Sequence, residues 1–271
     1  MKIGWRLMEE KKRAVAGRED EEGSSEMGCR RMRRRMSRPL VQEVFDLCKD
    51  VFRGPGSVPS PTDVQEMRLI LDRMTPADIG LSEDFFFNNN RAVNETPRMR
   101  YMHIDECGNL FSIGVFLLPQ SATIPLHDHP GMTVFTKLLF GSVRLRSYDW
   151  VEPFEPEDDL PSQIALAKLK VDDVFRAPCN AFVLYPASGG NLHCLQAVTP
   201  CAVLDVLGPP YSVHDGRDST YYQEFPYSSF SGAAHVAEDE TDQYRWLEKI
   251  EQPSLQVGPA DYAGPEIIKG F

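Results

Sequence analysis

The chain has 271 residues, 42% of them hydrophobic, which is enough to build one large domain with a buried core. No apolar run reaches the roughly 18 residues that a membrane-spanning helix needs, and the first residues lack the apolar stretch of a secretory signal. The net charge of −11 argues against broad nucleic-acid binding, because phosphate backbones attract basic surfaces. We therefore expect no membrane contact and no direct nucleic-acid binding.

The N-terminal segment, residues 1–38, differs from the rest of the chain. It carries twelve Lys or Arg and seven Asp or Glu, so the acidic excess lies in the remainder. Its apolar residues are sparse, which predicts a disordered basic tail. The run from Cys29 to Arg38 is typical of a nuclear-import signal or of a patch for anionic surfaces, and equally of a merely solvated tail. We expect the protein in the nucleus and the cytoplasm.

The cysteines are scattered and show no CxxC spacing. This pattern predicts reduced thiols in an intracellular protein, and it argues against a disulfide framework or a zinc knuckle. The six are Cys29, Cys48, Cys107, Cys179, Cys194 and Cys201.

Helices are predicted in the first part of the body. Apolar residues recur at helical spacing over residues 39–51, and Gly54 with the prolines after it ends this helix. A second helix is expected after Thr62, which can serve as its N-cap. Thr75 followed by Pro76 is typical of a third helix start. We expect these helices to pack on a β core.

From Tyr101 onward, short runs rich in Val, Ile, Phe and Tyr are separated by Gly, Pro, Asn and Asp. Many short strands at this spacing predict a mainly β fold, either an antiparallel sandwich or a small barrel. Residues 241–250 predict one C-terminal helix, and 251–271 a loose C-terminal tail. The expected strands are 101–104, 111–118, 134–140, 143–150, 164–170, 181–185, 194–198, 202–207 and 221–225.

Three histidines predict a metal site. In a strand, side chains at i and i+2 leave the same face, so His127 and His129 can point at one metal ion. His193, from a second strand, would complete a face of three nitrogen ligands. Such a face leaves coordination positions open, as a catalytic metal requires. An isolated HxH pair is more often a pair of surface histidines, so the prediction depends on the segments around it.

Those segments resemble the two motifs of the cupin superfamily. The HxH pair and Gly141 match the first motif, and residues 185–193, which end in His193, match the second. The glutamate usual in the first motif should fall at Thr133 or Val134, and neither is a carboxylate. Three neutral imidazoles leave Fe(II) with its full charge and favour an anionic ligand such as a thiolate.

Dense, ordered motifs extend over roughly residues 41–250. They are PLHDHPGMTVF at 125–135, KLLFG at 137–141, SYDW at 147–150, GGNLH at 189–193 and CAVLDVLGPPY at 201–211. Together they resemble the plant cysteine oxidases, thiol dioxygenases related to animal cysteamine dioxygenase. The resemblance implies a cupin-type double-stranded β-helix, a small antiparallel barrel, with N-terminal helices and one C-terminal helix, in a domain of residues 39–250.

The resemblance also implies an activity. The family uses Fe(II) and O₂ to oxidise the N-terminal cysteine of a protein to cysteine sulfinic acid, without a reducing cosubstrate. In plants the oxidised terminus leads to arginylation and N-degron turnover of ethylene-response transcription factors. The enzyme thereby acts as an oxygen sensor in the hypoxia response. The implied partners are these N-terminal cysteines and O₂, and we expect a monomer.

Site residues follow from the same resemblance. His127, His129 and His193 match the iron ligands, whereas Asp205 and Tyr211 match residues that line the site. Asp205 could orient a ligand histidine or receive the substrate ammonium. Tyr211 could donate a hydrogen bond to bound oxygen or to substrate. Both also fit structural roles, as a satisfied carboxylate and as a packing residue.

Two other functions stay open. A small-thiol dioxygenase for free cysteine or cysteamine would use the same chemistry. Arg144 and Arg146 alternate on one expected strand, and either could bind the carboxylate of free cysteine if it faced the site. A ligand-binding cupin without catalysis is the third alternative.

Overall fold

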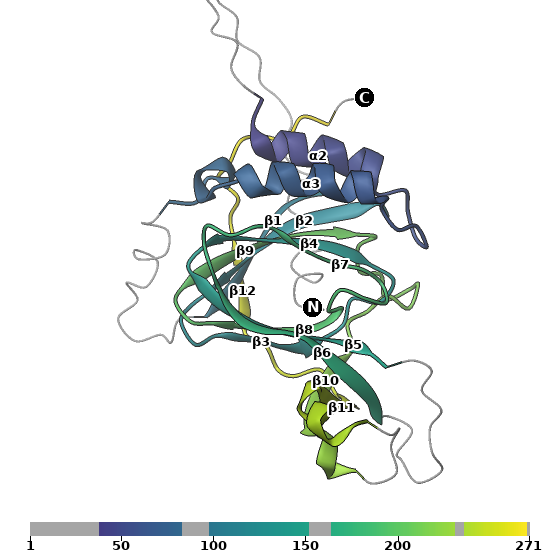
Figure 1. Ribbon diagram of the computed structural model, residues 1–271. Helices are drawn as coiled ribbons and strands as arrows, with labels where there is room; N and C mark the ends of the chain where they lie inside the picture. The colour runs from purple at the N-terminus through teal and green to yellow at the C-terminus, as the bar shows by residue number, and fades with distance from the viewer. Residues whose placement is uncertain (1–37, 83–97, 152–163, 231–235, 270–271) are drawn as a thin grey trace, which may run out of the picture.

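The computed structural model describes residues 38–82, 98–151, 164–230 and 236–269. The tail predicted over 1–38 lies outside these residues except for Arg38. Two helices cover one face of a six-stranded sheet, and the other face of that sheet looks onto a second layer of six strands (Figure 1). Within the described residues, no helix is both long and apolar enough to cross a membrane.

The helical elements pack on the outer face of the sheet. They are α2 (Leu40–Val51), α3 (Pro61–Arg73) and the 3₁₀ turn η1 (Pro76–Ile79). Ser60, not Thr62, caps α3: its hydroxyl accepts the Asp63 amide, and the Asp63 carboxylate accepts the Ser60 amide. The helices are anchored by aromatic packing, with the ring centroids of Phe45 and Phe111 5.3 Å apart.

The sheet beneath the helices contains β12, β1, β2, β9, β4 and β7, in that spatial order. These strands are β1 (Met99–Cys107), β2 (Phe111–Leu118), β4 (Thr133–Phe140), β7 (Phe182–Leu184), β9 (Cys201–Gly208) and β12 (Val257–Ala260). Both faces of β2 and β9 are covered, so these strands are buried along their whole length. On β9, Leu204 and Val206 belong to the core under the helices. Alternation therefore turns Val203 and Asp205 toward the second layer.

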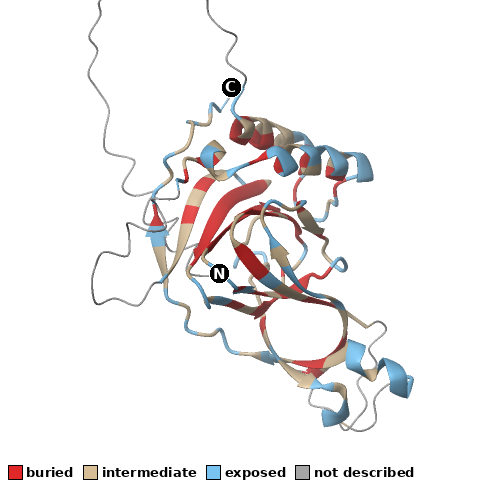
Figure 2. Cartoon of the chain, turned by 60° about the vertical axis from the view of Figure 1, so that its left-hand side comes forward, coloured by how far each residue is buried: buried red, intermediate tan, exposed pale blue. Residues whose placement is uncertain are grey.

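The second layer closes into a barrel in the order β10, β11, β6, β5, β8 and β3. Its elements are β3 (Thr123–His127), β5 (Ser142–Trp150), β6 (Ile164–Arg176), β8 (Leu192–Ala197), β10 (Tyr221–Pro226), β11 (Tyr244–Ile250) and the 3₁₀ turns η2 (Tyr227–Ser229) and η3 (Glu238–Gln243). Phe116, Leu138, Val143 and Leu195 join the two layers in one core. Figure 2 shows this burial along the strands. The predicted mainly β fold with a small antiparallel barrel is confirmed.

The predicted C-terminal helix is wrong. Residues 241–250 end η3 and then form β11, which pairs with β10 and β6. Trp246 and Leu247 are both buried because the two faces of β11 pack on separate apolar clusters. Two adjacent buried residues hide the alternation that marks a strand, so the apolar pattern resembled that of a helix.

The loose tail predicted over 251–271 also needs correction in its described part. β12 pairs in parallel with β1 and extends the sheet. Farther on, the Ile268 amide donates to Gln42 Oε1 on α2 at 2.7 Å. These residues are therefore fixed to the domain by backbone hydrogen bonds, although their sequence is rich in Pro and Gly.

Candidate metal centre

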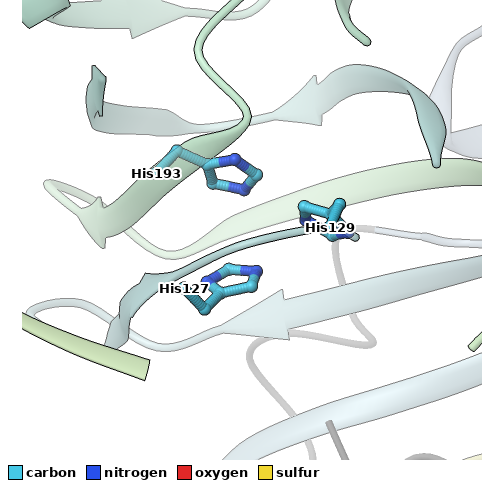
Figure 3. A group of neighbouring side chains, drawn as sticks. All are labelled: His127, His129 and His193. Atoms are coloured by element: carbon cyan, nitrogen blue, oxygen red, sulfur yellow. The ribbon is translucent and has the colours of Figure 1, made fainter. Parts of the chain in front are cut away.

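Three histidines lie together on neighbouring elements (Figure 3). His127 is the last residue of β3, and the antiparallel register sets it opposite His193 on β8. His129 lies two residues beyond the end of β3. The three side chains each offer a ligand atom, and these atoms all lie within 4.8 Å of one another. The structure therefore brings the three predicted ligands into one buried cluster.

The hydrogen bonds of the cluster leave nitrogen lone pairs available. His127 Nδ1 lies 2.8 Å from the carbonyl oxygen of Pro125. A carbonyl only accepts, so Nδ1 donates its proton and Nε2 carries the lone pair. Within the described residues, Nε2 of His127 and Nε2 of His129 are buried without a hydrogen-bond partner. Such orphaned atoms are costly unless something binds them, and the donor set fits a metal ion with open positions.

Burial also keeps the imidazoles neutral. It lowers the pKa of His127 and of His129 well below the usual value, and the neighbouring histidines lower both further. Burial lowers the pKa of His193 to about 4. All three rings are therefore neutral near neutral pH, which is the form that ligates metal.

Asn191 holds His129 although His129 is outside the strand. The side-chain Oδ1 of Asn191 accepts the His129 amide at 2.9 Å, and its Nδ2 donates to the His129 carbonyl at 3.0 Å. The same Nδ2 donates to the Tyr185 carbonyl at 2.7 Å. The side-chain amide thus takes the place of a neighbouring strand. It links the segment that carries His193 to the segment that carries His129.

The turn before His193 is held by Asp149 on β5. Its carboxylate accepts the amides of Gly189 at 3.1 Å and Gly190 at 2.7 Å. Gly190 has a φ of +83°, and a Cβ there would lie 2.5 Å from Ser147 Oγ. Glycine is therefore required at this position, both for the left-handed backbone and for the close approach of β5.

Tyr211 contacts a predicted ligand directly. Its hydroxyl oxygen lies 2.6 Å from His129 Nδ1 and 2.9 Å from Ser219 Oγ. Ser219 also donates to the Asp128 carbonyl at 3.1 Å. If His129 binds metal through Nε2, its Nδ1 carries the proton and donates to Tyr211. The phenol then fixes the tautomer and the orientation of the ring.

Asp205, unlike Tyr211, forms its hydrogen bond away from the three histidines. It faces the space between the layers, where its carboxylate accepts the Thr136 hydroxyl at 2.6 Å. Within the described residues its hydrogen bonds include none to a ligand histidine. Burial raises the pKa of Asp205 to about 7, although the Thr136 hydrogen bond opposes the rise. The structure thus gives no support to the expectation that Asp205 orients a histidine.

A cavity of about 290 Å³ reaches the cluster at His193. Apolar side chains dominate its lining, together with Thr136 and Ser147. Arg144 and Arg146 point away from it, because their neighbours on β5 line the cavity and strand residues alternate. Arg144 pairs instead with Asp172, and Arg146 with Glu224.

Four residues that position the site are not evident from sequence reasoning: Asn191, Asp149, Ser219 and Thr136. Asn191 and Asp149 lie inside the motifs GGNLH and SYDW, so motif density was the one signal that could have found them. Ser219 and Thr136 have no local signal, because their contacts depend on how distant segments meet.

Known proteins resemble this chain over most of its length. The family model PCO_ADO matches residues 70–267. Plant cysteine oxidase 2 of Arabidopsis thaliana is 46% identical, with 88% of each chain covered. Plant cysteine oxidase 1 of the same plant is 47% identical over 84% of this chain and 80% of its own. The 2-aminoethanethiol dioxygenase of Mus musculus is 31% identical over 84% of this chain and 96% of its own. The chain therefore belongs to the PCO_ADO family, the thiol dioxygenases that include the plant cysteine oxidases.

Proposed function

We propose that this thiol dioxygenase uses Fe(II) and O₂ to oxidise the N-terminal cysteine of a protein to cysteine sulfinic acid. The observation that carries the proposal is the buried cluster of His127, His129 and His193, which a mainly apolar cavity reaches at His193. The likeness to two plant cysteine oxidases supports the choice of substrate.

The proposed reaction balances without a cosubstrate. A thiol and one O₂ give a sulfinic acid, with two sulfur–oxygen bonds formed and the oxygen–oxygen bond broken. Sulfur loses four electrons and the two oxygen atoms gain them. The thiol proton remains with the product or passes to solvent, according to pH.

The three histidines would hold the iron. When bound, Fe(II) would supply open coordination positions and the redox chemistry that the oxidation of a thiol by O₂ requires. Because His127, His129 and His193 are neutral, they do not offset the metal charge, and an anionic sulfur ligand is favoured. The apolar lining of the cavity limits access of water, and Tyr211 holds His129 in the orientation that ligation requires.

Asp205 would bind the substrate amine. It faces the space between the layers beside Thr136, which lines the cavity. An ammonium group brought near this carboxylate stabilises its ionised form and lowers its raised pKa. Charge pairing would then hold the α-amine while the sulfur of the same cysteine is at the metal.

The arginines distinguish the substrate classes. Free cysteine carries a carboxylate close to its sulfur, and a site for it needs a cation nearby. Arg144 and Arg146 are paired on the outside of the barrel. An N-terminal cysteine has an amide in place of the carboxylate, which suits an apolar cavity. Cysteamine also lacks the carboxylate, so a small-thiol dioxygenase of that kind is the second candidate, favoured by the likeness to 2-aminoethanethiol dioxygenase.

We also propose a role in oxygen sensing. Ethylene-response transcription factors with N-terminal cysteine would be the substrates, and their oxidation would mark them for N-degron turnover. Low O₂ would slow the reaction and stabilise them. The identity of 46% and 47% to two plant cysteine oxidases supports this assignment.

A substrate comparison tests the function. The purified protein, loaded with Fe(II), is given a Cys-Gly-Gly-initiated peptide, cysteamine or free cysteine while O₂ uptake is followed. We expect the highest kcat/KM with the peptide and loss of uptake in His193→Ala. Preference for cysteamine would favour the second candidate. Full O₂ uptake in His193→Ala would refute the three-histidine site, and uptake with none of the thiols would favour a binding protein.

A further inference from the structure

The cavity that His193 lines is also lined by Arg68, on α3. α3 lies on the outer face of the sheet, whereas β8, the strand that carries His193, belongs to the barrel layer on the other side (Figure 1). A cavity lined by both must pass around an edge of the sheet. β7 is that edge, and the consecutive residues Ala181 to Leu184 all line the cavity. The cavity thus leads from the metal centre past β7 to the helix.

Arg68 is the unusual side chain of this passage. Among the described residues that line the cavity, only Arg68 and His193 are ionisable. Arg68 is partly buried, and in the described part of the chain it makes no hydrogen bond or ion pair. Arg73 on the same helix, by contrast, pairs with Glu43 at 2.6 Å. A partly desolvated guanidinium without a partner favours an anionic ligand, because all five of its N–H groups are donors.

The passage has the dimensions of an extended peptide. Packed layers lie roughly 10 Å apart, and one to two such spacings separate the barrel layer from α3. An extended chain advances about 3.3 Å per residue, so Arg68 lies roughly three to six residues beyond a cysteine at the metal. Near β7 the wall is apolar, with Val171, Phe182 and Leu184. Residues that follow the cysteine would therefore be uncharged, and the first charged group would meet Arg68.

We propose that the passage past β7 is the binding site for the substrate segment after the N-terminal cysteine, and that Arg68 selects an acidic side chain in that segment. This inference rests on the proposed function, since it requires a peptide substrate. Arg68 acts on specificity and takes no part in the oxidation itself.

A charge-swap experiment tests the proposal. Cys-Gly-Gly-initiated peptides carry a single Glu, moved outward one residue at a time, and matched peptides carry Lys at the same place. The measured quantity is the ratio of kcat/KM for the Glu peptide to that for the Lys peptide within one enzyme. Iron loading and folded fraction cancel in this ratio. The enzymes are wild type, Arg68→Gln, Arg68→Glu and, as a matched control on the same helix, Arg73→Gln.

We expect the wild type to favour Glu by about fivefold at one position, as a partly exposed ion pair allows. The ratio should fall to about one in Arg68→Gln, invert in Arg68→Glu and stay at the wild-type value in Arg73→Gln. The same ratio in wild type and Arg68→Glu, with the peptides still oxidised, would overturn the Arg68 site alone. Oxidation of cysteamine but of no peptide would overturn the proposed function and this site together.

Discussion

The side-chain amide of Asn191 forms two hydrogen bonds with the backbone of His129, at 2.9 Å to its amide and 3.0 Å to its carbonyl. These two residues lie 62 positions apart. The contact continues the pairing of β3 and β8 beyond the end of β3, where the His129 carbonyl also accepts the Met132 amide at 3.2 Å in a turn. The distance between two of the three histidine ligands therefore depends on one buried amide.

Asn191→Asp should weaken metal binding while it leaves the fold intact. The new carboxylate can still accept the His129 amide, but it cannot donate to the carbonyls of His129 and Tyr185. We expect affinity for Fe(II) or Co(II) to fall about 10- to 100-fold, measured by competition with a chromophoric chelator. Gln196→Glu, an amide-to-acid change at an exposed position on β8, the strand that follows Asn191, is the control. Equal affinities in all three proteins would refute the role of Asn191.

Tyr211→Phe should have a related effect on His129. The substitution keeps the ring but removes the hydroxyl 2.6 Å from Nδ1, and the buried nitrogen then lacks this partner. We expect metal affinity about tenfold weaker and slower turnover of the Cys-initiated peptide, with a smaller loss in Ser219→Ala. Chelator competition and initial rates measure both. An unchanged affinity together with a reduced rate would instead place the hydroxyl on substrate or oxygen.

Asp205→Asn should change how stability depends on pH. Burial raises the pKa of folded Asp205 from an ordinary 3.8 to about 7, so the carboxyl loses its proton at a lower pH in the unfolded chain than in the folded one. The free energy that the neutral carboxyl contributes to folding is therefore complete below about pH 4 and is lost as the pH rises toward about 7. The loss is at most about 1.4 kcal/mol for each unit by which folding raises the pKa. Asn stays neutral throughout.

The variant should therefore gain stability relative to wild type as pH rises through that window. Thermal melts of both metal-free proteins across the range measure the difference, in which the histidine titrations common to both cancel. A difference that does not vary with pH would show that Asp205 titrates normally.

Gly114→Ala should destabilise the wall next to Asp205. Gly114 lies opposite Asp205 in the sheet, and a Cβ there would lie 2.1 Å from the Tyr101 hydroxyl oxygen. We expect a loss of about 1–3 kcal/mol in the free energy of unfolding, measured with denaturant. Gly258→Ala is the matched control in a strand of the same sheet, because its Cβ would meet Arg100 Cγ at an ordinary 3.9 Å. A similar loss of unfolding free energy in both variants would contradict the close contact between Gly114 and Tyr101.

The sequence predicts the parts of this site that depend on local patterns. The i, i+2 spacing of His127 and His129 and the Gly-Gly turn before His193 are local, and the structure brings these residues together. Strand existence follows from apolar runs, so most strands fall within a few residues of their predicted bounds. The prediction places His127 and His129 on one strand, but β3 ends at His127. The bounds of β3 and the existence of β12 escape prediction because Pro interrupts both patterns.

Contacts between segments that are distant in the sequence cannot be predicted from local patterns. Whether Arg144 faces the cavity depends on the register of β5, and a shift of one residue would reverse it. The partner of Asp205 is Thr136 because β4 and β9 pair in one register. The same limit applies to Arg68, which reaches the cavity from a helix that sequence analysis assigns only to packing.

The most direct test of the central claim is the mass of a Cys-Gly-Gly-initiated peptide after aerobic incubation with the Fe(II)-loaded protein in isotopically labelled O₂. The account predicts a gain of two labelled oxygen atoms on the cysteine, dependent on O₂ and absent in His127→Ala. An unchanged mass with iron bound would contradict it, as would a gain of one oxygen atom or the same gain in His127→Ala.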